Sequence, residues 1–199
     1  MNTIRAFIAI ELAQSILTQL SAVQSQCKAA LPAGCVRWVR PGGIHLTLKF
    51  LGDVPTAQLD TIKAALAEAA GTSPTFSLEV GHLGCFPNLR RPSVVWVGIQ
   101  EPGGALVRLQ CAIESAVARL GYPSEKRPFS PHLTLGRVSR QARPGELRRL
   151  GEFVESAVIG RLGQMDVDEV VLIQSVLKPS GAEYTTLARA SLGQLKAGM

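Results

Sequence analysis

Several features that would assign this 199-residue sequence to a common class of protein are absent from it. No apolar run reaches the roughly 18 residues that a membrane-spanning helix needs, so we expect no membrane association. The first residues lack the apolar region and the small-residue cleavage site of a secretory signal, which favours a cytoplasmic location. We find neither a Gly-rich phosphate loop nor a cluster of metal ligands, and therefore expect no cofactor and no metal.

The few cysteines do not form a recognisable motif. Cys27, Cys35, Cys85 and Cys111 are scattered, and no two of them have the Cys-x-x-Cys spacing of zinc sites and redox motifs. Without a secretory signal, isolated cysteines are more often buried free thiols than parts of a disulfide framework. We therefore expect free and mostly buried thiols.

Composition and charge indicate an ordinary globular protein. Apolar residues make up 46% of the chain and charged residues 18%, and the length suits one domain or two small lobes that share a core. Lysine and arginine exceed aspartate and glutamate by 21 to 15, a net charge of +6. This modest excess suits an anionic ligand or a short nucleic acid, although many basic proteins bind neither.

One tetrapeptide occurs twice. His45-Leu46-Thr47-Leu48 returns as His132-Leu133-Thr134-Leu135, 87 positions further along the chain (132 minus 45). A single copy would most simply be an amphipathic strand. Two of only three histidines in identical tetrapeptides, each preceded by loop-forming residues, are poorly explained by chance. We therefore interpret the repeat as a functional motif.

Strand geometry indicates how each copy is used. Successive side chains of a strand point to opposite faces, so His45 and Thr47 share one face while Leu46 and Leu48 share the other. The same alternation applies to the second copy. Each motif thus buries two leucines and presents an imidazole beside a hydroxyl, and two motifs facing each other would form one polar site.

The remaining pattern predicts helices and strands in alternation. Apolar residues at helical spacing predict helices over 13–31, 56–70, 103–120 and 144–156. Strands are expected over 3–11, 36–39, 75–87, 93–99, 158–165, 168–177 and 183–190, in addition to the two motif strands. We expect a turn at Pro179-Ser180-Gly181 between the last two strands.

This order predicts an α+β fold. Each half of the sequence contains a motif strand, and no linker separates the halves. We expect residues 1–199 to form a single domain of two pseudo-symmetric lobes, with one motif in each lobe. In this arrangement two antiparallel sheets face a central cleft and the helices lie outside.

Two histidines and two threonines across a cleft suit acid–base chemistry on a phosphodiester. One imidazole can be neutral and the other protonated near neutral pH, so one can activate water while the other protonates a leaving oxygen. Threonine hydroxyls can donate hydrogen bonds to the non-bridging oxygens of a phosphate. Such a reaction needs no metal.

With these two motifs the sequence resembles the two-histidine (2H) phosphoesterase superfamily. Within that superfamily it resembles the LigT-like RNA 2′,3′-cyclic phosphodiesterases, also called 2′-5′ RNA ligases. The resemblance covers nearly the whole chain. It rests on both His-x-Thr motifs and on segments that match the opening strand, the central hairpin and the closing strands: Arg5–Ile10, Val36–Val39, Ile44–Gly52, Phe86-Pro87, Arg91-Pro92, Val95-Trp96, Phe129–Arg137, Ser175–Leu177, Gly181 and Tyr184.

The resemblance implies hydrolysis of a terminal 2′,3′-cyclic phosphate on RNA to a 2′-phosphate, and by reversal a 2′-5′ ligation. His45 would be the proton donor and His132 the proton acceptor, an assignment that the near-symmetry of the sequence alone does not decide. Thr47, Thr134 and Arg137 would bind the phosphate. The expected partners are RNA with a cyclic phosphate end, such as tRNA fragments, or 2′,3′-cyclic nucleotides, and the protein is expected to be a monomer.

Other residues have plainer interpretations beside functional ones. Phe7 on the first strand could stack on a base or pack in the core. Lys49 and Arg91 could line the cleft, but solvated surface charge is the default for both. Trp38 and Trp96 are expected in the core or at the rim, and His82, which no threonine follows two residues later, is expected in a structural or surface position.

Two alternative functions stay open from the sequence. One is a related 2H phosphodiesterase that acts on another small cyclic or linear nucleotide. The other is a module that binds a nucleotide without catalysis, although binding alone would not require a matched acid and base.

Overall fold

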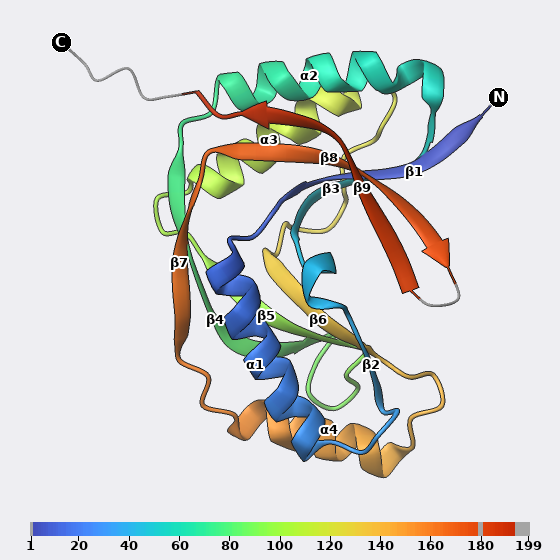
Figure 1. The fold of residues 1–199 in the computed structure, drawn as a ribbon, viewed down its shortest axis with the longest axis vertical. Helices are drawn as coiled ribbons and strands as arrows, with labels where there is room; N and C mark the ends of the chain where they lie inside the picture. Colours follow the sequence, from blue (N-terminus) through green and yellow to red (C-terminus); the bar gives the residue numbers. More distant parts are fainter. Residues whose placement is uncertain (1, 179–180, 194–199) are drawn as a thin grey trace.

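The computed structural model describes residues 2–178 and 181–193 (Figure 1). Four α-helices occur in this part of the chain: α1 (Gln14–Ala30), α2 (Leu59–Gly71), α3 (Ala105–Ala118) and α4 (Pro144–Ser156). The strands are β1 (Thr3–Ile10), β2 (Val36–Trp38), β3 (Leu46–Pro55), β4 (Phe76–Phe86), β5 (Val94–Gln100), β6 (His132–Val138), β7 (Arg161–Val167), β8 (Glu169–Lys178) and β9 (Gly181–Ser191). Short 3₁₀ helices, η1 (Pro41–Gly43) and η2 (Thr56–Gln58), precede β3 and α2.

The strands form one antiparallel sheet with the order β7-β4-β5-β6-β3-β1-β8-β9, and β2 pairs with β6. In the middle of this order, the register between β3 and β6 pairs Leu46 with Leu133. The ladders between the neighbouring strands are far longer; that between β1 and β3, for example, runs from Thr3 to Ile10. The sheet therefore consists of two half-sheets that meet at the two motifs.

Each half-sheet with its helices makes one lobe (Figure 1). We call β3, β1, β8 and β9 with α2 and α3 the β1 lobe, because α2 packs on β8 and β9 and α3 packs on β3. The strands β2 and β4 to β7 with α1 and α4 form the β5 lobe, since α1 packs on β7 and α4 on β4. One large hydrophobic cluster runs through both lobes, and a smaller cluster of Phe7, Ala9, Val171 and Ile173 lies in the β1 lobe.

This architecture confirms the predicted α+β class and most of the predicted elements. The two sheets expected from the sequence are two halves of one sheet in the structure, because the motif strands pair with each other at Leu46 and Leu133. The lobes also differ from the halves of the sequence, since β1 from the start of the chain and β8–β9 from its end lie in one lobe (Figure 1). Of the predicted turn, Pro179 and Ser180 lie outside the described residues.

A β-bulge interrupts each motif strand at the same place. The β1–β3 register shifts so that Leu48 and Lys49 both lie opposite Ile8, and both are buried. The β5–β6 register shifts by one residue in the same way, between Val95 and Trp96. An extra residue reverses the alternation beyond it, so Phe50 and Arg137, the next residues along each strand, return to the face of the motif side chains.

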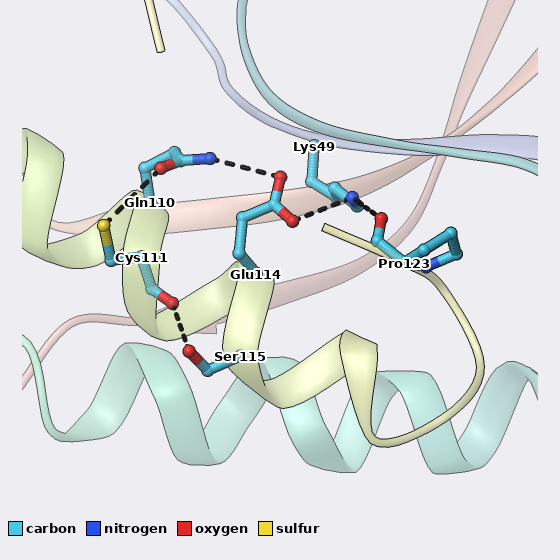
Figure 2. Close-up of polar contacts among 6 residues, drawn as sticks. All are labelled: Lys49, Gln110, Cys111, Glu114, Ser115 and Pro123. Atoms are coloured by element: carbon cyan, nitrogen blue, oxygen red, sulfur yellow. Dashed lines mark hydrogen bonds and ion pairs between the residues drawn. The ribbon is translucent and has the colours of Figure 1, made fainter. Parts of the chain in front are cut away.

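The bulge explains why the surface placement expected for Lys49 is wrong. Lys49 is only 3% exposed, and its Nζ donates hydrogen bonds to Glu114 Oε2 on α3 at 2.8 Å and to the carbonyl of Pro123 at 2.6 Å (Figure 2). The other carboxylate oxygen of Glu114 accepts a hydrogen bond from Gln110 at 3.2 Å. This buried pair ties the strand of the first motif to the loop that leads to the second.

A second buried polar side chain supports the other bulge. Gln24 on α1 is 1% exposed, and its Nε2 donates hydrogen bonds to the carbonyls of Leu135 and Val39, both at 2.8 Å. Leu135 is the extra residue at the β6 bulge, and its carbonyl also accepts a hydrogen bond from the backbone N–H of Val39 at 2.8 Å. Gln24 adds a side-chain hydrogen bond to this carbonyl and ties α1 to the strand of the second motif.

Two further expectations can be compared with the described residues. Cys27, Cys35 and Cys85 are buried free thiols, whereas Cys111 is exposed. Among the helices of the described ranges, none is long and apolar enough to cross a membrane.

Candidate active site

The two motifs meet where the half-sheets join. Leu46 pairs with Leu133, and both side chains are completely buried. In an antiparallel pair, residues on either side of a paired position oppose each other, so Thr47 lies toward His132 and His45 lies toward Thr134. The two histidines and two threonines are all half-buried and share the face opposite the leucines. The structure therefore brings the four predicted side chains together as two crossed His–Thr pairs.

The ring of His132 is oriented by the backbone just before it. Its Nδ1 lies 2.7 Å from the carbonyl oxygen of Ser130. A carbonyl oxygen can only accept, so Nδ1 carries the proton of this hydrogen bond. In the neutral imidazole the lone pair is then on Nε2, which can accept a proton from water.

His45 lies in a drier environment than an exposed imidazole. The backbone carbonyl of Gly43, two residues earlier in the chain, favours its charged form only weakly. Burial disfavours the imidazolium form and lowers the pKa of His45 to about 4, against smaller opposing effects of the Gly43 carbonyl and the Glu11 charge. His45 is consequently neutral at neutral pH as long as no anion lies beside it.

Two aromatic side chains cover His45. The Phe7 ring stacks on His45 with ring centroids 4.5 Å apart and an angle of 28°, and the edge of Tyr184 contacts His45 at 5.2 Å. Phe7 is only 3% exposed and stacks on His45, so of the two positions expected for it the structure favours packing over contact with a base. Phe50 and Tyr184, 56% and 38% exposed, are the aromatic rings next to Phe7 that a base can reach.

Two arginines place positive charge around Tyr184. Burial raises the pKa of the Tyr184 hydroxyl, and the charges of Arg137 and Arg5 oppose this shift. Arg137 belongs to β6 of one lobe and Tyr184 to β9 of the other, so the cation acts across the junction between the half-sheets. The sequence identified Arg137 as a candidate. Sequence reasoning missed Arg5, because nothing in the local sequence separates this exposed arginine of the first strand from an ordinary surface charge.

A cavity of about 250 Å³ lies beside His45 and is lined by Glu11, Tyr184 and Thr186, among others. Glu11 accepts hydrogen bonds from Thr186 Oγ1 at 3.1 Å and from Arg189 Nη2 at 2.8 Å. These residues come from opposite ends of the chain, which is why no local pattern in the sequence indicated them.

The remaining predicted residues lie away from the motifs or at their margin. Arg91 and His82 are exposed, in keeping with the surface positions expected for them. Trp38 is partly buried against the core, and Trp96 is partly buried on the motif face with its ring centroid 6.4 Å from that of His132. Within residues 2–178 and 181–193, no three His, Cys, Asp or Glu side chains are grouped to hold a metal ion.

Two crossed pairs of histidine and threonine on one sheet, with arginines beside them, define the site of a phosphoesterase. The family model of the LigT-like phosphoesterases matches residues 10–96 and again residues 97–184. The chain belongs to this family. The double match corresponds to the two copies of the motif.

Known relatives span almost the whole chain. The RNA 2′,3′-cyclic phosphodiesterase of Methanothermobacter thermautotrophicus is 33% identical over 92% of this chain and 96% of its own length. That of Archaeoglobus fulgidus is 32% identical over 92% of this chain and 97% of its own. The crystal structure of Escherichia coli LigT complexed with 3′-AMP aligns with a TM-score of 0.75 at 28% identity, over 97% of this chain and all of that one.

Proposed function

We propose that this enzyme hydrolyses the 2′,3′-cyclic phosphate at the 3′ end of RNA to a 2′-phosphate, with its two histidines as acid and base and without a metal ion. The observation that carries the proposal is the pairing of Leu46 with Leu133, which sets the two His–Thr pairs on one face. Relatives that are about one-third identical over nearly the full chain are RNA 2′,3′-cyclic phosphodiesterases, which supports the same substrate here.

In the proposed step, water attacks the phosphorus atom and the bond from phosphorus to the 3′-oxygen breaks. His132 takes the proton of the attacking water on Nε2, the nitrogen left free by the hydrogen bond from Nδ1 to Ser130. His45 gives a proton to the departing 3′-oxygen. The products are a 2′-phosphate and a 3′-hydroxyl, after which solvent returns one proton to His45 and removes one from His132.

The acid role requires that substrate binding protonate His45. With a pKa of about 4, the free imidazole holds no proton at neutral pH. The negative charge of a bound cyclic phosphate favours the imidazolium form and raises this pKa. The buried ring is thus charged only when an anion lies beside it, which couples the acid to the presence of substrate.

Thr47 and Thr134 would donate hydrogen bonds to the non-bridging phosphate oxygens, whose negative charge grows in the transition state. Arg137 would add a positive charge across the junction of the half-sheets. The 2′-oxygen that remains bonded to phosphorus exists only in RNA, so the substrate class follows from the bond. The net charge of +6 suits a polyanion such as a tRNA fragment. We further propose that the enzyme acts as a cytoplasmic monomer.

The same groups would work in reverse. If the 5′-hydroxyl of a second RNA replaces water as the nucleophile, it attacks the phosphorus atom of the cyclic phosphate and the bond from phosphorus to the 3′-oxygen breaks. The products are then a 2′-5′ linkage and a 3′-hydroxyl. Water is present at a far higher concentration than RNA ends, so hydrolysis should dominate. Incubation of RNA ends with a cyclic phosphate and a 5′-hydroxyl would reveal any joined product.

Product analysis tests the proposal. The enzyme is incubated with adenosine 2′,3′-cyclic phosphate in the presence of a chelator, and the products are separated from authentic 2′- and 3′-phosphates. The expected product is the 2′-phosphate, and both His45→Ala and His132→Ala should abolish most of the turnover while circular dichroism shows a folded protein.

Other outcomes would favour the alternatives. A 3′-phosphate would keep the two-histidine chemistry and reverse the leaving oxygen. Turnover that a chelator abolishes would contradict the metal-free mechanism. Binding without turnover would point to a nucleotide-binding module.

A further inference from the structure

A second and larger cavity, of about 730 Å³, lies in the β5 lobe and does not include either catalytic histidine. Its walls include His82, Gly84 and Trp96 of the strands and Asn88 and Arg90 of the loop that joins β4 to β5. This volume falls in the range of about 300–1,000 Å³ that is typical of sites for small organic ligands. The cavity beside His45, at about 250 Å³, falls below that range.

A row of aromatic rings connects His132 with this cavity. The centroid of Phe86 lies 4.9 Å from that of His132, Trp96 follows 5.0 Å from Phe86, and His82 follows 6.0 Å from Trp96. Single-stranded nucleic acids bind by stacking their bases on such rings. The row begins at a catalytic imidazole and ends in the wall of the cavity.

Two features of Trp96 are unusual for a ring that serves only as packing. A side chain at position 84 would collide with the six-membered ring of Trp96, so a glycine there allows the indole to lie flat across β4. The indole Nε1 is buried, and within the described residues it has no hydrogen-bond partner. Buried donors without an acceptor are rare in folded proteins, so packing alone does not explain this position of the indole.

The strand edge at the cavity is also irregular. His82 has a left-handed backbone with φ of 64° and lies at a register shift between β4 and β5. A residue other than glycine seldom adopts this conformation, and such positions gather at functional sites. Beyond Gly81 the described pairing of β4 with β7 ends, so residues 82–85 have β5 on one side and line the cavity.

The charge at the rim suits a phosphate backbone. Asn88 Oδ1 accepts hydrogen bonds from the backbone N–H groups of Arg90 and Arg91 at 3.1 and 3.0 Å, which fixes the tight turn that carries both cations. Arg90 lines the cavity and Arg91 is exposed beside it. Glu155 of α4 also lines the cavity and adds a carboxylate that can accept hydrogen bonds from base amino groups or a ribose hydroxyl.

We propose that this cavity binds the nucleotide on the 5′ side of the terminal one, with its base along Trp96 and His82 and its phosphate near Arg90. The inference rests on the proposed function. A cyclic phosphate ends the RNA at its 3′ side, so the chain continues only in the 5′ direction from the catalytic site. The preferred substrate is therefore an oligoribonucleotide and not a free cyclic mononucleotide.

The test compares two substrates that differ by one nucleotide: adenosine 2′,3′-cyclic phosphate and the dinucleotide ApA with the same cyclic end. We expect kcat/KM to be roughly tenfold higher for the dinucleotide, the size of effect of one stacked base. A ratio near one, with the mononucleotide still hydrolysed, would overturn the subsite and leave the proposed function intact. No turnover of either substrate would overturn both.

Two variants locate the effect. Arg90→Ala and His82→Asn, which keeps a residue that tolerates a positive φ, should each lower the dinucleotide-to-mononucleotide ratio toward one. Arg119→Ala is the matched control, because Arg119 is an exposed arginine at the end of α3 in the other lobe, and it should keep the ratio. If both cavity variants keep the wild-type ratio, the additional nucleotide binds elsewhere and the inference is wrong. Should His82→Asn fail to fold, Arg90→Ala alone decides.

Discussion

Phe7 stacks on His45, with 4.5 Å between the ring centroids, and thereby keeps water from one face of the imidazole. This contact joins the first strand of the chain to the first motif through the β1–β3 ladder, in which Phe7 lies opposite Phe50. Because the dry surroundings disfavour the charged ring, the pKa of His45 is lowered to about 4. The protonation state of the proposed acid thus depends on a residue that never touches the reacting atoms.

Phe7→Ala should raise the pKa of His45 from about 4 toward its ordinary value of 6.5, because water then solvates the imidazolium. An NMR titration of the histidine ring protons measures the shift directly. Phe50→Ala is the control, since Phe50 is 56% exposed and is not in ring contact with His45. An unchanged His45 pKa in Phe7→Ala would show that other groups dominate the desolvation.

The same pKa predicts the acid side of the pH–rate profile. A pair of histidines that carries two protons lacks a base, so kcat/KM should fall as the pH drops below about 4 in the wild-type enzyme. In Phe7→Ala, the fall should begin at a higher pH, because the His45 proton is then bound more tightly. Initial rates at low substrate concentration across the acid range, at constant ionic strength, provide the measurement. If the wild type and Phe7→Ala have the same pH profile, protonation of His45 does not cause the fall of kcat/KM at acid pH.

Changing the leaving atom can show which histidine is the acid and which is the base, whereas a pH profile cannot assign these roles. In a substrate with sulfur in place of the 3′-oxygen, the leaving thiol has a pKa of about 8.5 and needs no proton from the enzyme. His45→Ala should therefore lose far less activity on the sulfur substrate than on the oxygen substrate. His132→Ala should lose similar activity on both, because water still needs a base. The opposite pattern would exchange the roles of the two histidines.

Local sequence patterns predicted the elements that define the motif face. Alternation placed Leu46 and Leu133 in the core and the histidines and threonines on the other side, and the structure agrees. The same alternation failed at Lys49, because a bulge adds one residue to β3 and turns the lysine into the core. A bulge depends on the partner strand, so the alternation within β3 alone does not encode it.

Contacts between segments that lie far apart in the chain could not be predicted from the sequence either. Stacking on a base and packing in the core both stayed open for Phe7, because its neighbour Tyr184 lies 177 positions later in the chain (184 minus 7). Glu11, Thr186 and Arg189 form a network between the two ends of the chain that no local window contains. The one continuous sheet, in place of two, follows from a single register between the repeated motifs.

Arg137→Gln should lower kcat/KM by about a hundredfold, because it removes a positive charge that would stabilise the negative charge growing on the phosphate in the transition state. It should also weaken the dependence of kcat/KM on salt, since fewer cations then attract the anion. Arg37→Gln is a matched control, as Arg37 is an exposed arginine paired with Arg137 on the neighbouring strand. If the two variants lose the same activity, Arg137 contributes only to the general positive charge of this surface.

The buried pair of Lys49 and Glu114 should link stability to catalysis (Figure 2). Lys49→Met leaves the Glu114 carboxylate buried without its cation and should lower the free energy of unfolding by about 3–5 kcal/mol. The double variant Lys49→Met/Glu114→Leu should recover most of this loss, because buried apolar side chains can replace a buried ion pair at little cost. Urea denaturation of the wild type, both single variants and the double variant measures the coupling.

The exposed pair of Lys63 and Asp60, 2.9 Å apart, is the control for this cycle, and Lys63→Met should change the free energy of unfolding by less than about 1 kcal/mol. Turnover should respond differently from stability. Lys49 also holds the carbonyl of Pro123, at the start of the loop that leads to His132, and no apolar side chain can replace that hydrogen bond. The double variant should therefore be stable yet keep a reduced kcat. A double variant with full stability and full kcat would show that Lys49 supports the fold alone and does not position the second histidine.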